Sequence, residues 1–105
     1  MSSVKNNQDK KTNWQVYILL ASDGRLYTGI TTNMIQRWRK HCSKKGAKFF
    51  YGRKPIALNY LESEHTRSSA SQREYQIKQL TRAEKWQLIV DNYGPKKGSH
   101  TNRKS

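Results

Sequence analysis

The sequence has few of the residues that cross-link a small protein. Cys42 is the single cysteine among 105 residues, so the chain cannot form an intrachain disulfide. Cys42 and the scattered histidines His41, His65 and His100 do not have the ligand spacing of a structural zinc site. These counts exclude scaffolds held together by disulfides or by structural zinc.

Long apolar runs are also absent. No run approaches the ~20 apolar residues that a membrane-spanning helix needs. Residues 1–13 contain no apolar stretch of the kind found in signal peptides. We therefore expect a soluble cytoplasmic protein that does not bind membranes.

Acidic residues are scarce, because the sequence has 7 Asp and Glu against 21 Lys and Arg, which gives a formal net charge of +14. Such an excess on a small surface favours polyanionic partners, and nucleic acid is the first candidate. The hydrophobic fraction of 33% and the mean hydropathy of -1.06 are low, but 10% aromatic residues can supply a core. The length suits one domain.

The distribution of charged and apolar residues predicts one domain between two tails. Residues 1–13 carry three Lys and one Asp, and residues 94–105 carry four Lys and Arg and no acid. Both segments lack periodic apolar positions, so we expect flexible basic tails that add nonspecific affinity for phosphates. The predicted domain spans residues 14–93.

Residues 14–31 are predicted to form a β-hairpin, because apolar residues alternate on both sides of a Ser-Asp-Gly turn. A two-residue loop would pair Tyr17 with Ile30 and mix the apolar and polar faces. A three-residue loop at residues 22–24 keeps the apolar side chains together on one face. This register places Tyr17 opposite Gly29.

The remainder of the domain predicts one strand and three helices. The first helix has apolar positions Met34, Ile35, Trp38 and Cys42, while Arg37, His41 and Lys44 fall on a basic face. The predicted elements after the hairpin are a helix from the cap Asn33 to Cys42, a strand over 56–62, a helix over 69–80, and a helix from the capping box at Thr81 to about Asn92. The expected fold is α/β, a small three-stranded antiparallel sheet flanked by helices in the order ββαβαα.

An ordered set of short motifs resembles the GIY-YIG nuclease domain over residues 14 to about 90. The set is Val16-Tyr17-Ile18, then Tyr27-Thr28-Gly29, then Arg37, His41 and Glu74. Val16 and Thr28 depart from the namesake letters, but both lie off the functional Tyr and Gly positions. The chain also resembles the small stand-alone members of the family, which lack the separate DNA-binding domain of larger relatives.

This resemblance implies an endonuclease that hydrolyses phosphodiester bonds in DNA by in-line attack of water, with DNA repair as a setting. It implies that Glu74 binds one hydrated divalent cation, Mg²⁺ with Mn²⁺ as the alternative. Arg37 would meet the charge that develops on the scissile phosphate, and His41 would orient or exchange a proton with the water or the tyrosines. Tyr17 would accept the proton of the attacking water, or organise that water, together with Tyr27.

Each of these residues also has a purely structural interpretation. Glu74 and Lys78 could form an exposed helical pair worth ~0.3 kcal/mol. Arg37 and His41 could belong to a solvated basic face, and the two tyrosines could be half-buried sheet aromatics whose hydroxyls reach water. Under the resemblance, Gly29 would instead leave space for the phosphate to approach Tyr17.

The segment 43–54 interleaves cations with Phe49, Phe50 and Tyr51, a pattern typical of nucleic-acid contact surfaces. We predict that at least one Phe belongs to the core and that most cations contact phosphates. The predicted nucleic-acid-binding residues are Lys44, Lys45, Lys48, Arg53, Lys54 and Lys78.

The expected partner is nucleic acid, DNA rather than RNA, bound by a monomer, with a protein partner as a source of specificity. Two other functions remain open. One is a nucleic-acid-binding module of the same fold, for DNA or RNA, that has weak or no turnover or needs a partner. The other is a small RNA-binding or ribosome-associated protein, which the net charge of +14 would also support.

Overall fold

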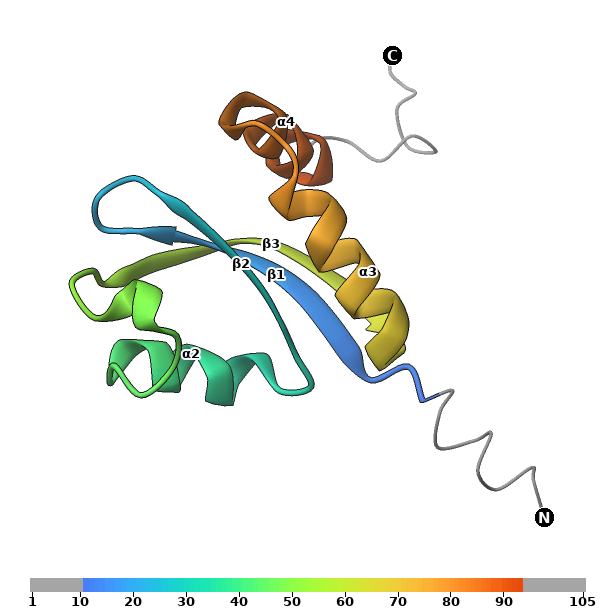
Figure 1. Cartoon of the computed structure of the whole chain (residues 1–105), viewed down its shortest axis with the longest axis horizontal. Helices are drawn as coiled ribbons and strands as arrows, with labels where there is room; N and C mark the ends of the chain where they lie inside the picture. The colour runs from blue at the N-terminus through green and yellow to red at the C-terminus, as the bar shows by residue number, and fades with distance from the viewer. Residues whose placement is uncertain (1–10, 94–105) are drawn as a thin grey trace.

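The computed structural model describes residues 11–93, and its elements follow the predicted order ββαβαα (Figure 1). The predicted tails lie outside the described residues, apart from residues 11–13, and stay predictions. No helix within residues 11–93 has the length and apolar character needed to cross a membrane. The elements are β1 (Trp14–Ala21), β2 (Leu26–Thr31), α2 (Met34–Cys42), the 3₁₀ helix η1 (Lys48–Phe50), β3 (Pro55–His65), α3 (Arg67–Lys78) and α4 (Arg82–Tyr93).

The sheet is antiparallel, with strand order β2-β1-β3, so β1 is the central strand. The predicted hairpin register is confirmed, since Tyr17 pairs with Gly29 across the two strands. The amide of Ala21 donates to the carbonyl of Arg25 at 2.8 Å and closes a three-residue loop. Gly24 has a φ of 89°, a left-handed conformation that glycine adopts without steric cost.

Two predicted boundaries were wrong. The third strand is longer than the predicted 56–62, because its polar end stays paired with β1 as far as His65 opposite Trp14. The next helix begins before the predicted Ser69, because Thr66 and Ser69 form a reciprocal capping box at its N-terminus. Strand pairing causes the first difference and side-chain capping the second, and apolar periodicity reveals neither.

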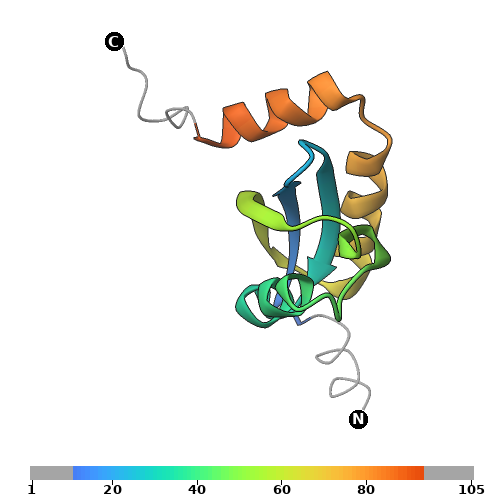
Figure 2. The same ribbon diagram turned by 90° about the vertical axis from the view of Figure 1, so that its left-hand side faces the viewer.

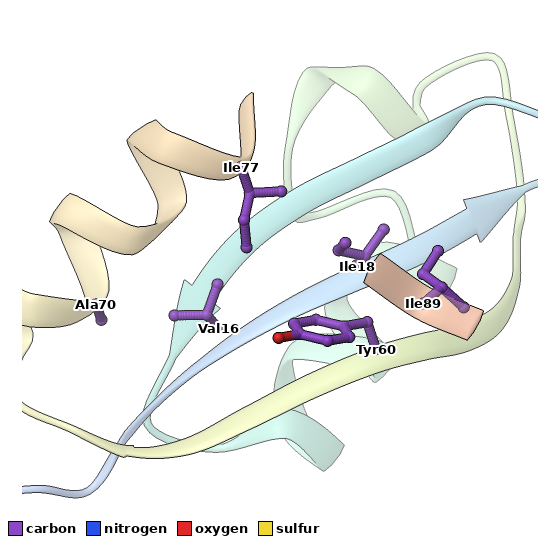
Figure 3. Packing of buried hydrophobic residues seen from close by; sticks show 6 residues of the cluster. All are labelled: Val16, Ile18, Tyr60, Ala70, Ile77 and Ile89. Atoms are coloured by element: carbon purple, nitrogen blue, oxygen red, sulfur yellow. The ribbon is translucent and has the colours of Figure 1, made fainter. Parts of the chain in front are cut away.

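One face of the sheet packs against α3 and α4 (Figure 3). The buried side chains of this cluster come from β1, β3 and both helices: Val16, Ile18, Tyr60, Ala70, Ile77 and Ile89. In Figure 2, α4 lies across the end of the sheet that carries the hairpin loop. There a Cβ added to Gly24 would lie 4.0 Å from an Arg82 guanidinium nitrogen.

The opposite face of the sheet packs against α2 and η1, so Figure 1 shows α2 and α3 on opposite sides of the strands. Asn33 caps α2 as predicted, accepting from the amide of Gln36 at 3.0 Å. The predicted apolar stripe of this helix was partly wrong, because Ile35 and Cys42 are exposed and His41 is buried instead. The imidazole of His41 therefore belongs to the interior of this layer.

Candidate active site

A buried hydrogen bond joins the central strand to α2. The Tyr17 hydroxyl lies 3.0 Å from Nε2 of His41, and each residue is only 1% exposed. For Tyr17, the alternative of a half-buried sheet tyrosine is therefore wrong. His41, in turn, does not belong to a solvated basic face.

Two glycines allow these side chains to approach the backbone. A Cβ at Gly29 would lie 2.6 Å from Cζ of Tyr17, and a Cβ at Gly46 would lie 2.5 Å from Nδ1 of His41. The expectation that Gly29 leaves room for a phosphate needs correction, because the Tyr17 ring fills that space. Gly46 was missed by the sequence analysis, and its place in a lysine-rich loop was the single available signal.

Aromatic rings enclose the imidazole of His41. Phe50 is fully buried with its ring centroid 4.6 Å from that of His41, and Tyr27 meets His41 edge-on at 5.4 Å. Phe49 packs on Tyr27 at 5.1 Å. The prediction that at least one Phe belongs to the core is confirmed, while Tyr27 remains half-buried in this cluster.

Burial determines the protonation of the pair. Removal from water raises the pKa of Tyr17 far above its usual value, with a further rise from Tyr27 that Arg37 partly opposes. Burial, and then the positive charge of Arg37, lowers the pKa of His41 to about 4. At neutral pH the hydrogen bond therefore joins a neutral phenol to a neutral imidazole.

Arg37 and Glu74 bring opposite charges to the tyrosines from different elements. The charges of both residues act on the hydroxyls of Tyr17 and Tyr27. Within residues 11–93 Arg37 makes no ion pair, whereas Glu74 pairs with Lys78 at 3.1 Å and keeps 24% of its side chain exposed. The helical pair exists, but Glu74 also lies close enough to influence the tyrosine site.

Five polar residues on β3 and α3 form a network that the sequence analysis missed. Glu62 accepts from Nε of Arg73 at 2.7 Å, from Nε2 of His65 at 2.7 Å, and from the hydroxyl of Tyr60. Ser69 contacts Nδ1 of His65 at 2.8 Å. Because Arg73 precedes Glu74, this network fixes the helix segment that carries the candidate metal ligand.

The predicted nucleic-acid-binding cations fall into two groups. Lys44, Lys45, Lys48 and Lys54 are exposed. Arg53 instead donates to Asp23 at 2.6 Å and lies 4.4 Å over the ring of Phe49. Of this predicted set, Arg53 and Lys78 already have protein partners, whereas the four lysines make no ion pair within residues 11–93.

The donors present fit a weakly chelated hydrated cation. Residues 11–93 contain no group of three His, Cys, Asp or Glu that could hold a metal. Glu74 offers one partly exposed carboxylate beside the tyrosines. Mg²⁺ is commonly held by one or two carboxylates together with waters and substrate phosphates, so Glu74 is the residue that could hold it here.

Comparison with known proteins gives consistent matches across the domain. The profile of the GIY-YIG catalytic domain matches residues 13–87. A UPF0213 protein of Desulfotalea psychrophila is 43% identical over 90 residues, covering 85% of this chain and 82% of that protein. One from Halobacterium salinarum is 47% identical over 74 residues, covering 70% of this chain and 96% of that protein.

Solved structures agree with the observed fold. The solution NMR structure of a UPF0213 protein from Bacillus halodurans has a TM-score of 0.51 and 41% identity, covering 78% of this chain and 87% of that one. The solution NMR structure of a protein from E. faecalis has a TM-score of 0.54 and 32% identity, covering 84% of this chain and 94% of that one. The chain spans most of the length of each of these proteins.

Proposed function

Because the chain belongs to the GIY-YIG catalytic domain family, we propose that it is a metal-dependent endonuclease that hydrolyses phosphodiester bonds in DNA. The observation that carries this proposal is the buried hydrogen bond between Tyr17 and His41, 3.0 Å long, within the electrostatic reach of Arg37 and Glu74. The reaction is in-line attack by water, which releases a 3′-hydroxyl and a 5′-phosphate.

The Tyr17–His41 pair accepts the proton of the attacking water. The water proton moves to the Tyr17 oxygen as the Tyr17 hydroxyl proton moves to Nε2 of His41, so a phenolate does not accumulate. Burial keeps the imidazole unprotonated before the reaction, so that Nε2 can accept a proton, and burial also opposes ionisation of Tyr17, which favours a concerted over a stepwise transfer. Tyr27, half-buried in the same cluster, orients the water.

Arg37 stabilises the phosphate as charge develops on its oxygens. Its guanidinium is permanently charged and presents a planar fork of donors that matches two phosphate oxygens. Because Arg37 makes no ion pair within the described part of the chain, no protein carboxylate has to be displaced first. A divalent cation held by Glu74, when bound, would stabilise the leaving 3′ oxygen.

Cleavage of a panel of labelled nucleic acids tests this proposal. The panel contains duplex, branched, flapped and single-stranded DNA and the matching RNA forms, each with Mg²⁺, Mn²⁺ or EDTA. We expect DNA cleavage with Mg²⁺ or Mn²⁺ and none with EDTA. Binding without cleavage under every metal condition would instead support a binding module without turnover, and a preference for RNA would overturn the choice of substrate.

The variant Glu74→Gln should abolish metal-dependent cleavage and leave folding and DNA binding intact. Glutamine keeps the shape and helix propensity of the side chain but removes the anionic oxygen that Mg²⁺ requires. Glu64→Gln makes the same chemical change at an exposed position of β3 and serves as the matched control. Thermal melting and a binding titration in EDTA accompany the assay. Wild-type cleavage by a folded Glu74→Gln chain would refute the metal assignment.

A further inference from the structure

A small polar cavity lies beside the candidate active site on the α2 side of the sheet. Its volume is about 120 Å³, enough for a phosphate group but not for a nucleoside. It is formed where the start of β1, the end of β2 and the first two turns of α2 meet. The lining residues are Trp14, Thr31, Thr32, Gln36, Arg37 and Lys40.

The lining contains hydrogen-bond donors and positive charge but no carboxylate. Arg37 and Lys40 lie one helical turn apart on α2, and neither makes an ion pair within residues 11–93. Two cations that share a recess and lack a counter-ion attract an anion strongly. The side chains of Thr32 and Gln36 add neutral donors to the lining.

The walls of this cavity are fixed by local contacts. The Thr31 hydroxyl donates to the carbonyl of Asn33 at 3.2 Å and accepts from its amide at 3.0 Å, which holds the turn between β2 and α2. The Arg67 guanidinium lies 5.5 Å over the ring of Trp14, a lining residue, and helps to hold that ring in place. The recess is therefore preformed and positively charged.

Arg37 borders both this cavity and the tyrosine site. Its charge acts on Tyr17 and His41 on one side, and its side chain lines the cavity on the other. A guanidinium has five N–H donors and can serve two neighbouring anions. The cavity is thus placed for the phosphate next to the one that Arg37 would hold during hydrolysis.

We infer that this cavity is a second phosphate-binding subsite, which holds the backbone phosphodiester adjacent to the scissile phosphate. Lys40 supplies its principal charge, and Gln36 and Thr32 supply neutral donors. That the subsite lies next to the reacting phosphate rests on the proposed nuclease function. That a DNA phosphate occupies the subsite does not rest on it, because binding is measured without cleavage.

The test uses the full chain in EDTA and a short fluorescent DNA duplex whose affinity is measured at several salt concentrations. Lys40→Gln removes the charge from the cavity. Lys85→Gln removes the same charge from α4, on the other side of the sheet, and controls for net charge. We expect Lys40→Gln to weaken binding about tenfold more than the control and to reduce the salt slope by about 0.9, the value for one phosphate contact.

Amide resonances identify where the duplex binds. Adding duplex to the wild-type chain should shift the amides of Thr32 and Gln36, and these shifts should shrink in Lys40→Gln. Inorganic phosphate is titrated in parallel. Three outcomes would each overturn the inference. The first is that the two lysine variants lose affinity and salt slope equally, and the second is that the duplex does not bind. The third is that inorganic phosphate shifts these amides as strongly as the duplex does. A chain that binds DNA here but never cleaves it would refute the proposed function alone.

Discussion

His41 shows at the residue scale how burial changes the protonation of a side chain that the sequence places on a basic helix face. Its Nε2 lies 3.0 Å from the Tyr17 hydroxyl, and burial lowers its pKa to about 4 from an unperturbed value of ~6.5. Between these values the unfolded chain binds a proton that the folded chain excludes. Stability is therefore fully present above pH ~6.5 and is lost as the pH falls through about 4.

This linkage predicts an acid-sensitive fold. Relative to a His41→Gln variant, the wild-type chain should lose about 3 kcal/mol of unfolding free energy between pH 7 and pH 4. The difference between the two chains isolates His41, because the carboxyl groups titrate in both. Urea unfolding at several pH values measures it, and parallel stability curves would show that His41 is not kept neutral by the fold.

Arg37 allows a test of geometry against charge. Arg37→Lys keeps a positive charge but replaces the planar fork by a single ammonium. We expect turnover to fall ~10²-fold, the usual loss for one transition-state donor, with DNA affinity nearly unchanged. Separate measurement of binding in EDTA and of single-turnover cleavage distinguishes the two effects. Equal losses in affinity and rate would make Arg37 a plain binding residue.

At the scale of elements, the contact between β3 and α3 determines where Glu74 lies. Arg73 and Glu62 are joined at 2.7 Å, with 31% and 21% of their side chains exposed. Arg73→Met keeps the apolar stem but leaves Glu62 with two donors. We expect a loss of about 1–2 kcal/mol in unfolding free energy, and a cleavage defect that is larger at low than at saturating Mg²⁺.

The control for this variant is Gln72→Met, on the exposed surface of the same helix. Urea unfolding and the Mg²⁺ dependence of cleavage are measured for both chains. A destabilised Arg73→Met chain with an unchanged Mg²⁺ dependence would make the network purely structural, with no effect on the position of Glu74.

The elements that the sequence predicted well are those with local signals. Alternating apolar residues with a three-residue loop specified the hairpin register, and Asn33 and Thr81 marked the starts of two helices through their caps. The end of β3 was misplaced because its polar residues are held by pairing with β1. The start of α3 was misplaced because its capping box has Ser69 at the N3 position.

The candidate site was predictable only in part. Its residue types followed from motif order, but the interior position of His41 did not, because a histidine on a basic helix looks solvent-exposed until its partner Tyr17 is placed in space. The Glu62–Arg73 contact joins positions 11 residues apart on different elements, and no local pattern marks it. Contacts between elements are the part of the site that sequence periodicity does not encode.

At the scale of the whole molecule, the fold separates the buried tyrosine–histidine pair from the surface charges. The tyrosine–histidine pair is buried between the sheet and α2, whereas the free lysines and the polar cavity lie at the surface around it. A phosphate backbone can therefore be held by surface cations without separating the buried pair. This arrangement makes binding sensitive to salt and the buried pair insensitive to it.

The excess of positive charge predicts that DNA binding weakens steeply with salt, since each neutralised phosphate contributes about -0.9 to the slope of log K against log salt. Residues 96–105 carry four Lys and Arg and lie outside the described residues. Replacing them by a Gly-Ser segment of equal length should reduce the slope by about 0.9 for each phosphate contact they make. Cleavage at saturating DNA should not change, because every candidate catalytic residue lies within 14–93. Binding titrations in EDTA at several salt concentrations measure the slope, and an unchanged value would mean that this segment contacts no phosphates.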